Sequence, residues 1–199
     1  MRAKLQQSAA AGLRRSVAWA AGAMLLLAAG AAAAERLHKY TVAIDPALST
    51  LSVRACFVGI APSALAAESL DATLALIDIR AENSRKSIEP SGSISLKSVP
   101  ENGCVLYRVD VSRPIRQHDR TGDKIHRIGK DLLTSTGLWL WRPEKLEADE
   151  DIEVTFVLPE GIAVSAPWKP VSLSSERAVF RTGRSPYDRP ASVAFGRFK

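Results

Sequence analysis

The sequence predicts a mainly β protein, an antiparallel β-sandwich that can include one short helix, preceded by a helical signal peptide. Three observations support this prediction. The first residues have the charge and hydropathy order of an export leader. After them, short segments alternate apolar and polar residues with the period of two that half-buried strands show. Turn-forming residues separate these segments at close spacing, as in sandwich folds.

Residues 1–34 have the three parts of a cleavable signal peptide. Basic residues come first, an apolar run follows from Val17 to Gly30, and Ala31–Ala34 offers the small residues that signal peptidase accepts. We expect cleavage before Glu35, which leaves a single domain of residues 35–199. The alternative is a retained anchor helix, because the apolar run reaches about 18 residues if Ala31–Ala34 is included, the lower margin for spanning a bilayer.

The leader changes what the charge of the chain implies. Four of the 27 basic residues and none of the 21 acidic residues precede Glu35, which leaves 23 basic and 21 acidic residues and a net charge of +2. This near balance argues against a nucleic-acid-binding protein. The mature residues hold no second long apolar run. We therefore expect no membrane association after cleavage, and a periplasmic or secreted location.

Cys56 and Cys104 are the two cysteines of the chain. Export would deliver them to an oxidising compartment, where a disulfide can persist. Their bond would close a loop of about 48 residues, worth ~4 kcal/mol in the chain-entropy model. We predict this disulfide, with two buried free thiols on neighbouring strands as the alternative. A metal site is not expected, because neither cysteine has a second Cys or a His at ligand spacing.

The first strands are recognisable from their alternation. Lys39–Ile44 and Thr50–Val58 flank the turn residues Asp45-Pro46 and predict an opening hairpin. In Ala61–Ile79, a helix and a strand cannot be separated by pattern alone. The polar segment Ala81–Glu89 predicts an exposed connection.

Later segments follow the same reasoning. Arg113–Lys130 is the most polar stretch and predicts a surface loop. Asp131–Pro143 is apolar and ends at a proline, and Trp139 and Trp141 would share one face of any strand in it. The other predicted strands are Ile94–Leu96, Cys104–Val111, Ile152–Leu158, Val164–Trp168 (stopped by Pro167 and Pro170), Ala178–Arg181 and Ser192–Phe198.

Several motifs of the mature chain occur together in one known family. They are Trp141-Arg142-Pro143, Ile152–Gly161, Ser165-Ala166-Pro167-Trp168, Tyr40–Asp45, Leu51-x-Val53 and Asp131-Leu132-Leu133. With these motifs, and most clearly from Trp139 to Pro170, the chain resembles the N-terminal domain of the family M61 glycyl aminopeptidases. The resemblance covers most of the mature chain and implies a β-sandwich of the kind that precedes a thermolysin-like zinc domain and often a PDZ domain.

The zinc chemistry of that family has no counterpart in these residues. A peptidase of that type needs His-Glu-x-x-His on a helix. The mature chain has His38, His118 and His126, none of them with this spacing or a neighbouring Glu, and it reaches Lys199 about where the zinc domain would begin. The family's activity therefore cannot be carried over to any residue, and we expect no catalytic site.

Other motifs predict neither catalysis nor a cofactor. The chain has no Gly-x-Ser-x-Gly and no phosphate loop. His118 and His126 could be metal ligands with Asp119 or Asp123, and Asp149–Asp151 could contact calcium, but solvated loop residues are the favoured interpretation of both groups. We therefore expect no metal and no cofactor.

An interaction surface is the remaining kind of site. Trp139 and Trp141 could bind a sugar or a partner from an exposed face, although packing in the core is the favoured interpretation. Trp168 could belong to the same surface. Arg116 and Arg120, in the basic segment, could meet an acidic partner.

Three functions remain open from the sequence. The leading hypothesis is an exported non-catalytic sandwich domain that binds a protein or peptide. The second is the front part of a zinc aminopeptidase whose catalytic domain is missing or separately encoded. The third is a periplasmic carbohydrate-binding module that uses its tryptophans.

Overall fold

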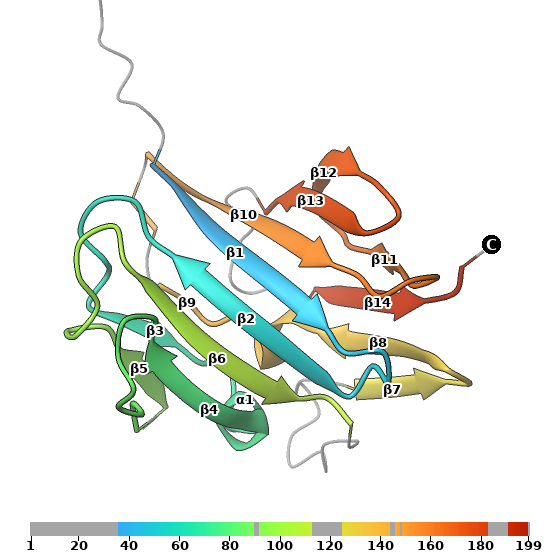
Figure 1. The fold of residues 1–199 in the computed structure, drawn as a ribbon, viewed down its shortest axis with the longest axis horizontal. Coiled ribbons are helices and arrows are strands. Elements are labelled where there is room, and N and C mark those ends of the chain that lie inside the picture. The colour runs from blue at the N-terminus through green and yellow to red at the C-terminus, as the bar shows by residue number, and fades with distance from the viewer. Residues whose placement is uncertain are drawn as a thin grey trace, which may run out of the picture. The chain divides into compact units, whose positions relative to one another are not determined.

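Three β-sheets contain most of the described residues (Figure 1). The computed structural model describes residues 36–89, 92–112, 125–143, 146–147, 149–182 and 191–198, all within one compact unit, Ala33–Lys199. The expected leader lies outside them, so its cleavage stays a prediction. The elements, in chain order, are β1 (Arg36–Ile44), β2 (Thr50–Cys56), β3 (Ala64–Ala66), α1 (Leu70–Ala75), β4 (Leu76–Ala81), β5 (Ser93–Ser95), β6 (Cys104–Asp110), β7 (Ile125–Ile128), β8 (Asp131–Ser135), the 3-10 helix η1 (Thr136–Leu138), β9 (Arg142–Pro143), β10 (Glu150–Val157), β11 (Ala163–Ser165), β12 (Lys169–Leu173), β13 (Arg177–Arg181) and β14 (Ser192–Gly196).

The largest sheet has seven strands in the order β12-β13-β10-β1-β2-β6-β4. The predicted opening hairpin is confirmed as β1 and β2. Every neighbouring pair in this sheet is antiparallel except β1 and β10, which are parallel. Figure 1 shows the blue β1 beside the orange β10, pointing the same way. The mainly β fold class is confirmed, and the parallel pair is the one departure from all-antiparallel pairing within this sheet.

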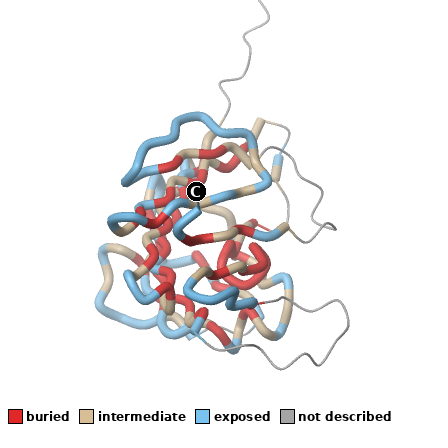
Figure 2. Tube along the Cα trace, turned by 90° about the vertical axis from the view of Figure 1, so that its right-hand side faces the viewer, coloured by how far each residue is buried: buried red, intermediate tan, exposed pale blue. Residues whose placement is uncertain are grey.

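The core of the sandwich lies between the large sheet and the four-stranded sheet β11-β14-β8-β7. Phe156 of β10 and Phe195 of β14 bridge the two sheets, with their ring centroids 5.4 Å apart. Alternate residues of the strands face this core, as the period of two predicts. In β1 the buried residues are His38, Tyr40, Val42 and Ile44. Figure 2 shows the buried residues in the interior and the exposed ones on the turns around it.

The segment that was ambiguous in sequence contains both kinds of structure. Ala61–Ile79 includes β3, the short helix α1 and the start of β4. The side chain of Ser69 caps α1, because its Oγ accepts a hydrogen bond from the Ala72 N–H at 3.1 Å. None of the described helices is long and apolar enough to cross a membrane.

Two stretches differ from the predicted loop and strand ends. Ile125–Ile128 is strand β7 and not part of a surface loop, because it pairs with β8. Residues 113–124 of the expected loop lie outside the described residues. Pro170 does not end a strand but lies within β12, an edge strand of the large sheet. Proline is tolerated in an edge strand because one side of the strand's backbone needs no partner strand.

No strand runs through the two tryptophans, so they do not share the face of a strand. β8 ends at Ser135, and the chain then turns through η1. The N–H groups of Trp139 and Leu140 both donate to the Thr136 carbonyl, at 3.2 and 2.8 Å. Trp139 and Trp141 therefore follow a helical turn rather than a strand.

Candidate functional site

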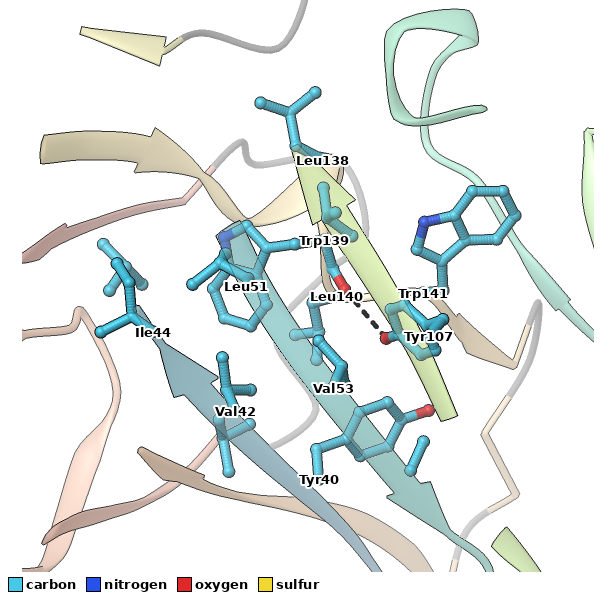
Figure 3. Close-up of a cluster of buried hydrophobic side chains, with 14 of the residues drawn as sticks. Tyr40, Val42, Ile44, Leu51, Val53, Tyr107, Leu138, Trp139, Leu140 and Trp141 are labelled. Atoms are coloured by element: carbon cyan, nitrogen blue, oxygen red, sulfur yellow. Dashed lines mark hydrogen bonds between the residues drawn. The ribbon is translucent and has the colours of Figure 1, made fainter. Parts of the chain in front are cut away.

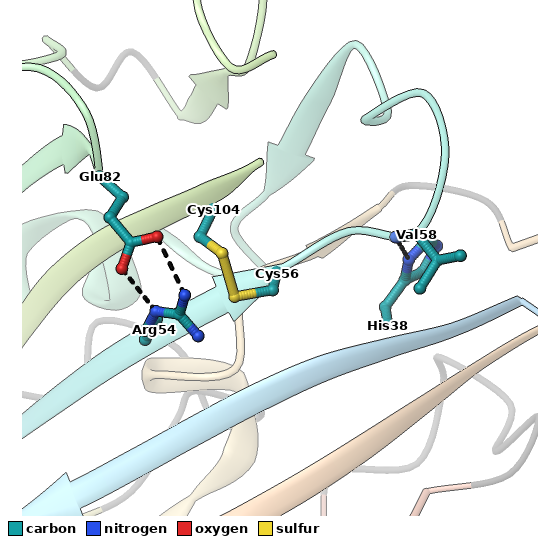
Figure 4. The surroundings of a disulfide bond; sticks show 6 residues. All are labelled: His38, Arg54, Cys56, Val58, Glu82 and Cys104. Carbon is teal, nitrogen blue, oxygen red and sulfur yellow. Dashed lines mark hydrogen bonds and ion pairs between the residues drawn. A yellow bond between two sulfur atoms is a disulfide. The ribbon is translucent and has the colours of Figure 1, made fainter. Parts of the chain in front are cut away.

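The predicted disulfide is confirmed. Cys56 of β2 and Cys104 of β6 lie directly opposite each other in the pairing of these strands, and they are bonded, with Cα atoms 4.1 Å apart. Figure 4 shows the bond beside the ion pair of Arg54 and Glu82. The disulfide crosslinks two central strands of the large sheet on the face that points away from the core.

Trp139 and Trp141 do not form an interaction surface. Both are fully buried, which confirms the packing interpretation and removes the basis for a sugar site built on these rings. Figure 3 shows them among the core side chains, where the Tyr107 hydroxyl donates to the Trp139 carbonyl at 2.9 Å. Trp168 is half-buried, and its ring stacks on Phe156 at 6.4 Å and meets the edge of Trp139 at 6.3 Å.

The other predicted candidates give no site in the described part of the chain. Arg116, Arg120 and His118 lie outside the described residues. His126 is exposed on β7. Among the described residues, no group of three or more His, Cys, Asp or Glu could hold a metal ion.

His38 is buried near the beginning of β1, beside the carboxylate of Glu150. Its Nε2 lies 3.5 Å from Glu150 Oε1, and its side chain is 1% exposed. Its Nδ1 accepts a hydrogen bond from the Val58 N–H at 3.3 Å (Figure 4). Burial lowers the pKa of His38, and the neighbouring Glu150 opposes that shift. A histidine this deeply buried cannot reach a substrate in solvent, so its role is structural.

The candidate site is a groove on the outward face of the large sheet, which we call the open-sheet groove. It has a volume of about 500 Å³ and lies over β1, β2, β6 and β4. Two rows of side chains cross these four strands in register. The first row is Thr41, Arg54, Leu106 and Arg80, and the second is Ala43, Ser52, Arg108 and Asp78.

The shape of the groove follows from the sizes of these side chains. Ala43, Ser52 and Thr41 are short and leave a hollow above β1 and β2, while Arg54 and Arg108 are long and stand beside it. Successive outward residues of a strand lie two positions apart. The outward positions of β1 and β2 therefore supply the floor, and the long side chains of β2 and β6 supply the walls.

Two of the three arginines are held by carboxylates of the β4 region. Arg54 binds Glu82 through two hydrogen bonds, Nε to Oε1 at 2.6 Å and Nη2 to Oε2 at 3.0 Å. This contact lowers the pKa of the Glu82 carboxyl. Arg108 donates from Nε to Asp78 Oδ2 at 2.8 Å, and the bond raises the pKa of its guanidinium. Arg80 of β4 lies between Asp78 and Glu82 in the sequence. No ion pair joins Arg80 to another described residue.

The arrangement is suited to binding carboxylates. A guanidinium presents its N–H donors in a planar fork that matches a carboxylate. Exposed ion pairs contribute little net free energy, so carboxylates of a partner can replace Asp78 and Glu82 at low cost. The sequence shows that Arg54, Arg80 and Arg108 each lie between apolar neighbours in a strand, which places them on an outward face. It does not show which strands are adjacent, and for this reason the groove was missed.

Comparisons with known proteins assign no family to the chain. No family model matches it, and a search of the curated proteins finds no match. Among solved structures, native leukotriene A4 hydrolase from Saccharomyces cerevisiae is similar with a TM-score of 0.40 and 11% identity, over 81% of this chain and 28% of that chain. The yeast enzyme in complex with bestatin has a TM-score of 0.36 and 9% identity, over 82% of this chain and 28% of that chain. This chain thus spans 28% of the length of these proteins, and the low scores assign it no activity.

Proposed function

We propose that this chain is an exported, non-catalytic β domain that binds an acidic peptide segment of a partner protein in the open-sheet groove. The observation that carries the proposal is the convergence of three arginines from β2, β4 and β6 around one hollow of about 500 Å³. This volume is within the range of sites that enclose a sizeable ligand, roughly 300–1,000 Å³. A few residues of an extended peptide would fill it.

The charge of the groove specifies the partner. Its lining includes Arg54, Arg80 and Arg108 but only one carboxylate, that of Asp78. An acidic segment would gain charge-assisted hydrogen bonds from the guanidinium groups. Leu106 and the methyl group of Thr41 provide apolar contacts in the same hollow. A partner with neutral groups alone would leave Arg80, which makes no ion pair with another described residue, without a carboxylate.

A non-catalytic role agrees with the chemistry of the described residues. General acid-base catalysis needs a titratable group within reach of bound substrate. The groove is lined by three arginines, Asp78 and neutral side chains. Arginine stays protonated at physiological pH, and the Asp78 carboxylate is bound by Arg108. We expect the purified chain to hydrolyse no peptide substrate, including glycyl peptides. Turnover that copurifies with the chain would contradict this and favour an aminopeptidase fragment.

The groove can be tested with hexaglutamate as the acidic probe. We expect the full chain to bind it in calorimetric titration, and R54Q/R108Q to weaken binding by about tenfold or more, because each charged hydrogen bond contributes ~1.5–3 kcal/mol. K97Q/K169Q is the matched control, since it removes the same charge from two exposed lysines outside the groove. Equal weakening by both variants, or no binding by the full chain, would refute the proposed site.

Export has its own test. Mass spectrometry of the chain expressed in a bacterial host should find the mature protein in the periplasm or medium, starting at Glu35. A full-length chain that stays with the membrane fraction would instead identify the leader as an anchor helix.

A further inference from the structure

A second hollow lies where the turn between β1 and β2 meets the ends of β7, β8 and β14. It has a volume of about 250 Å³, and we call it the basic pocket. Three cationic side chains line it, those of Arg127 on β7, Lys130 in the turn before β8, and Arg197 after β14. Asp131 is the one carboxylate in the lining, so these side chains together carry a net charge of +2.

The three cations lack the carboxylate partners that Arg54 and Arg108 of the open-sheet groove have. Within the described ranges, no ion pair joins Arg127, Lys130 or Arg197 to an acidic side chain. Like charges held near one another repel. An anion placed among them would relieve this repulsion and accept their hydrogen bonds.

Hydrogen bonds hold one wall of the pocket in place. Arg127 Nη2 donates to the carbonyl of Leu48 at 2.5 Å, which fixes its guanidinium beside the β1–β2 turn. Leu48 has a φ of 54°, a conformation that non-glycine residues rarely adopt. Asp45 supports this turn, because its carboxylate accepts hydrogen bonds from the N–H groups of Ser49 and Thr50 at 2.6 and 2.9 Å.

Glycines place the other two cations. Gly129 has a φ of 62° in the turn between β7 and β8, directly before Lys130. Gly196 passes so close to Asp131 that a Cβ there would collide with the carboxylate. The next residue, Arg197, donates its backbone N–H to Asp131 Oδ1 at 3.1 Å. The backbone positions of these residues are therefore set before any ligand arrives, which reduces the entropic cost of binding.

We propose that the basic pocket binds a phosphate group, a use of the fold beyond the peptide binding proposed above. A phosphate monoester carries a charge of roughly −1.5 to −2 at neutral pH, which matches the net charge of the lining. Its oxygens accept paired hydrogen bonds from the guanidinium of an arginine, and the ammonium of a lysine attracts them as a point charge. The pocket is also smaller than the roughly 300–1,000 Å³ typical of drug-sized ligands, so a compact anion suits it better than an extended segment.

The test is a titration of the full chain with sodium phosphate against sodium chloride of equal ionic strength, followed by NMR. We expect saturable shifts of the Lys130 and Arg197 amide signals with phosphate only. K130Q/R197Q should weaken phosphate binding by about tenfold or more. K86Q/K97Q is the matched control, because it makes the same charge change at two exposed lysines outside the pocket, and it should bind phosphate like the unchanged chain.

A second arm distinguishes free phosphate from phosphate on a lipid. Flotation with vesicles of phosphatidylcholine and phosphatidic acid should retain the chain, but not K130Q/R197Q, if a lipid phosphate reaches the pocket. Binding of free phosphate without vesicle retention supports the proposal and restricts the ligand to soluble phosphates. Saturable shifts that K130Q/R197Q leaves unchanged, or no binding in either arm, would overturn it.

Discussion

The two faces of the large sheet use the same strands for different purposes. The inward residues of β1 and β6 pack in the core, and three of them, Tyr40, Val42 and Tyr107, are at most 1% exposed. The outward residues Arg54 and Arg108 have side chains 47% and 53% exposed and make ion pairs. A change on the inner face should therefore act on stability, and a change on the outer face should act on recognition.

The physical reason is the difference in solvent on the two sides. Burying a large apolar side chain contributes roughly 1.5–3 kcal/mol, and a cavity in its place costs more. An ion pair in water contributes at most about 1 kcal/mol, because both groups are well solvated when they are apart. The outer face can consequently carry exchangeable charges without weakening the fold. The predictions below test this division, from the largest expected effect to the smallest.

The largest effect is expected from Trp139 on the inner side. Trp139→Ala should lower the free energy of unfolding by about 3–5 kcal/mol, because the ring is fully buried and meets Phe156 and Trp168. Urea unfolding followed by circular dichroism measures it. Val171→Ala, at a side chain that is 55% exposed, is the control and should change little. Similar losses for both variants would contradict the division between the faces.

The disulfide is an exception to this division between the faces. It lies on the outer face, yet we expect it to stabilise the fold. C56S/C104S should lower the free energy of unfolding by about 2–4 kcal/mol, because a closed loop restricts the unfolded chain. The two cysteines are 48 positions apart. Reduction of the unchanged protein with dithiothreitol should lower its urea midpoint to that of the variant. An unchanged midpoint after verified reduction would show that the bond does not stabilise the fold.

A pH effect is expected from His38, a buried titratable residue on the inner face of β1. Its ordinary pKa of 6.5 is lowered in the folded chain, first by burial, with Glu150 opposing and Arg36 adding to the shift. Below pH 6.5 the unfolded chain binds a proton that the folded chain takes up only at lower pH. The free energy of unfolding should therefore fall as the pH drops from 6.5 towards the folded pKa, and His38 should add no pH dependence well above 6.5.

The measurement is urea unfolding at a series of pH values for the unchanged chain and for His38→Gln. Glutamine does not titrate in this range, and the other histidines are present in both proteins. The decline below pH 6.5 should be shallower in the variant. Equal slopes would show that His38 binds its proton alike in both states.

The smallest effect on stability is expected on the outer face. Arg54→Ala should change the free energy of unfolding by less than about 1 kcal/mol, because its bond to Glu82 joins two solvent-exposed groups. The same substitution should still weaken hexaglutamate binding. Chemical denaturation and calorimetric titration on one sample separate the two effects. A large loss of stability would mean that the outer ion pairs hold the sheet together.

Much of the fold could be predicted because it depends on neighbours in sequence. Alternation of apolar residues predicted the hairpin of β1 and β2 and the strand β10. The disulfide of Cys56 and Cys104 was predicted from the oxidising compartment that an exported chain would reach, and the structure confirms the bond. The strands β7 and β12 were missed, because a polar edge strand and a strand with Pro170 look like loops until a partner strand is present.

The candidate site could not be predicted in the same way. The sequence by itself determined which residues face outward, since that follows from a period of two along each strand. Only the tertiary structure decided that β2 lies beside β6 and β6 beside β4, which brings Arg54, Arg80 and Arg108 to one groove. It likewise placed β10 parallel to β1. Strand order is set by packing between segments far apart in the chain, and the local pattern carries no record of that packing.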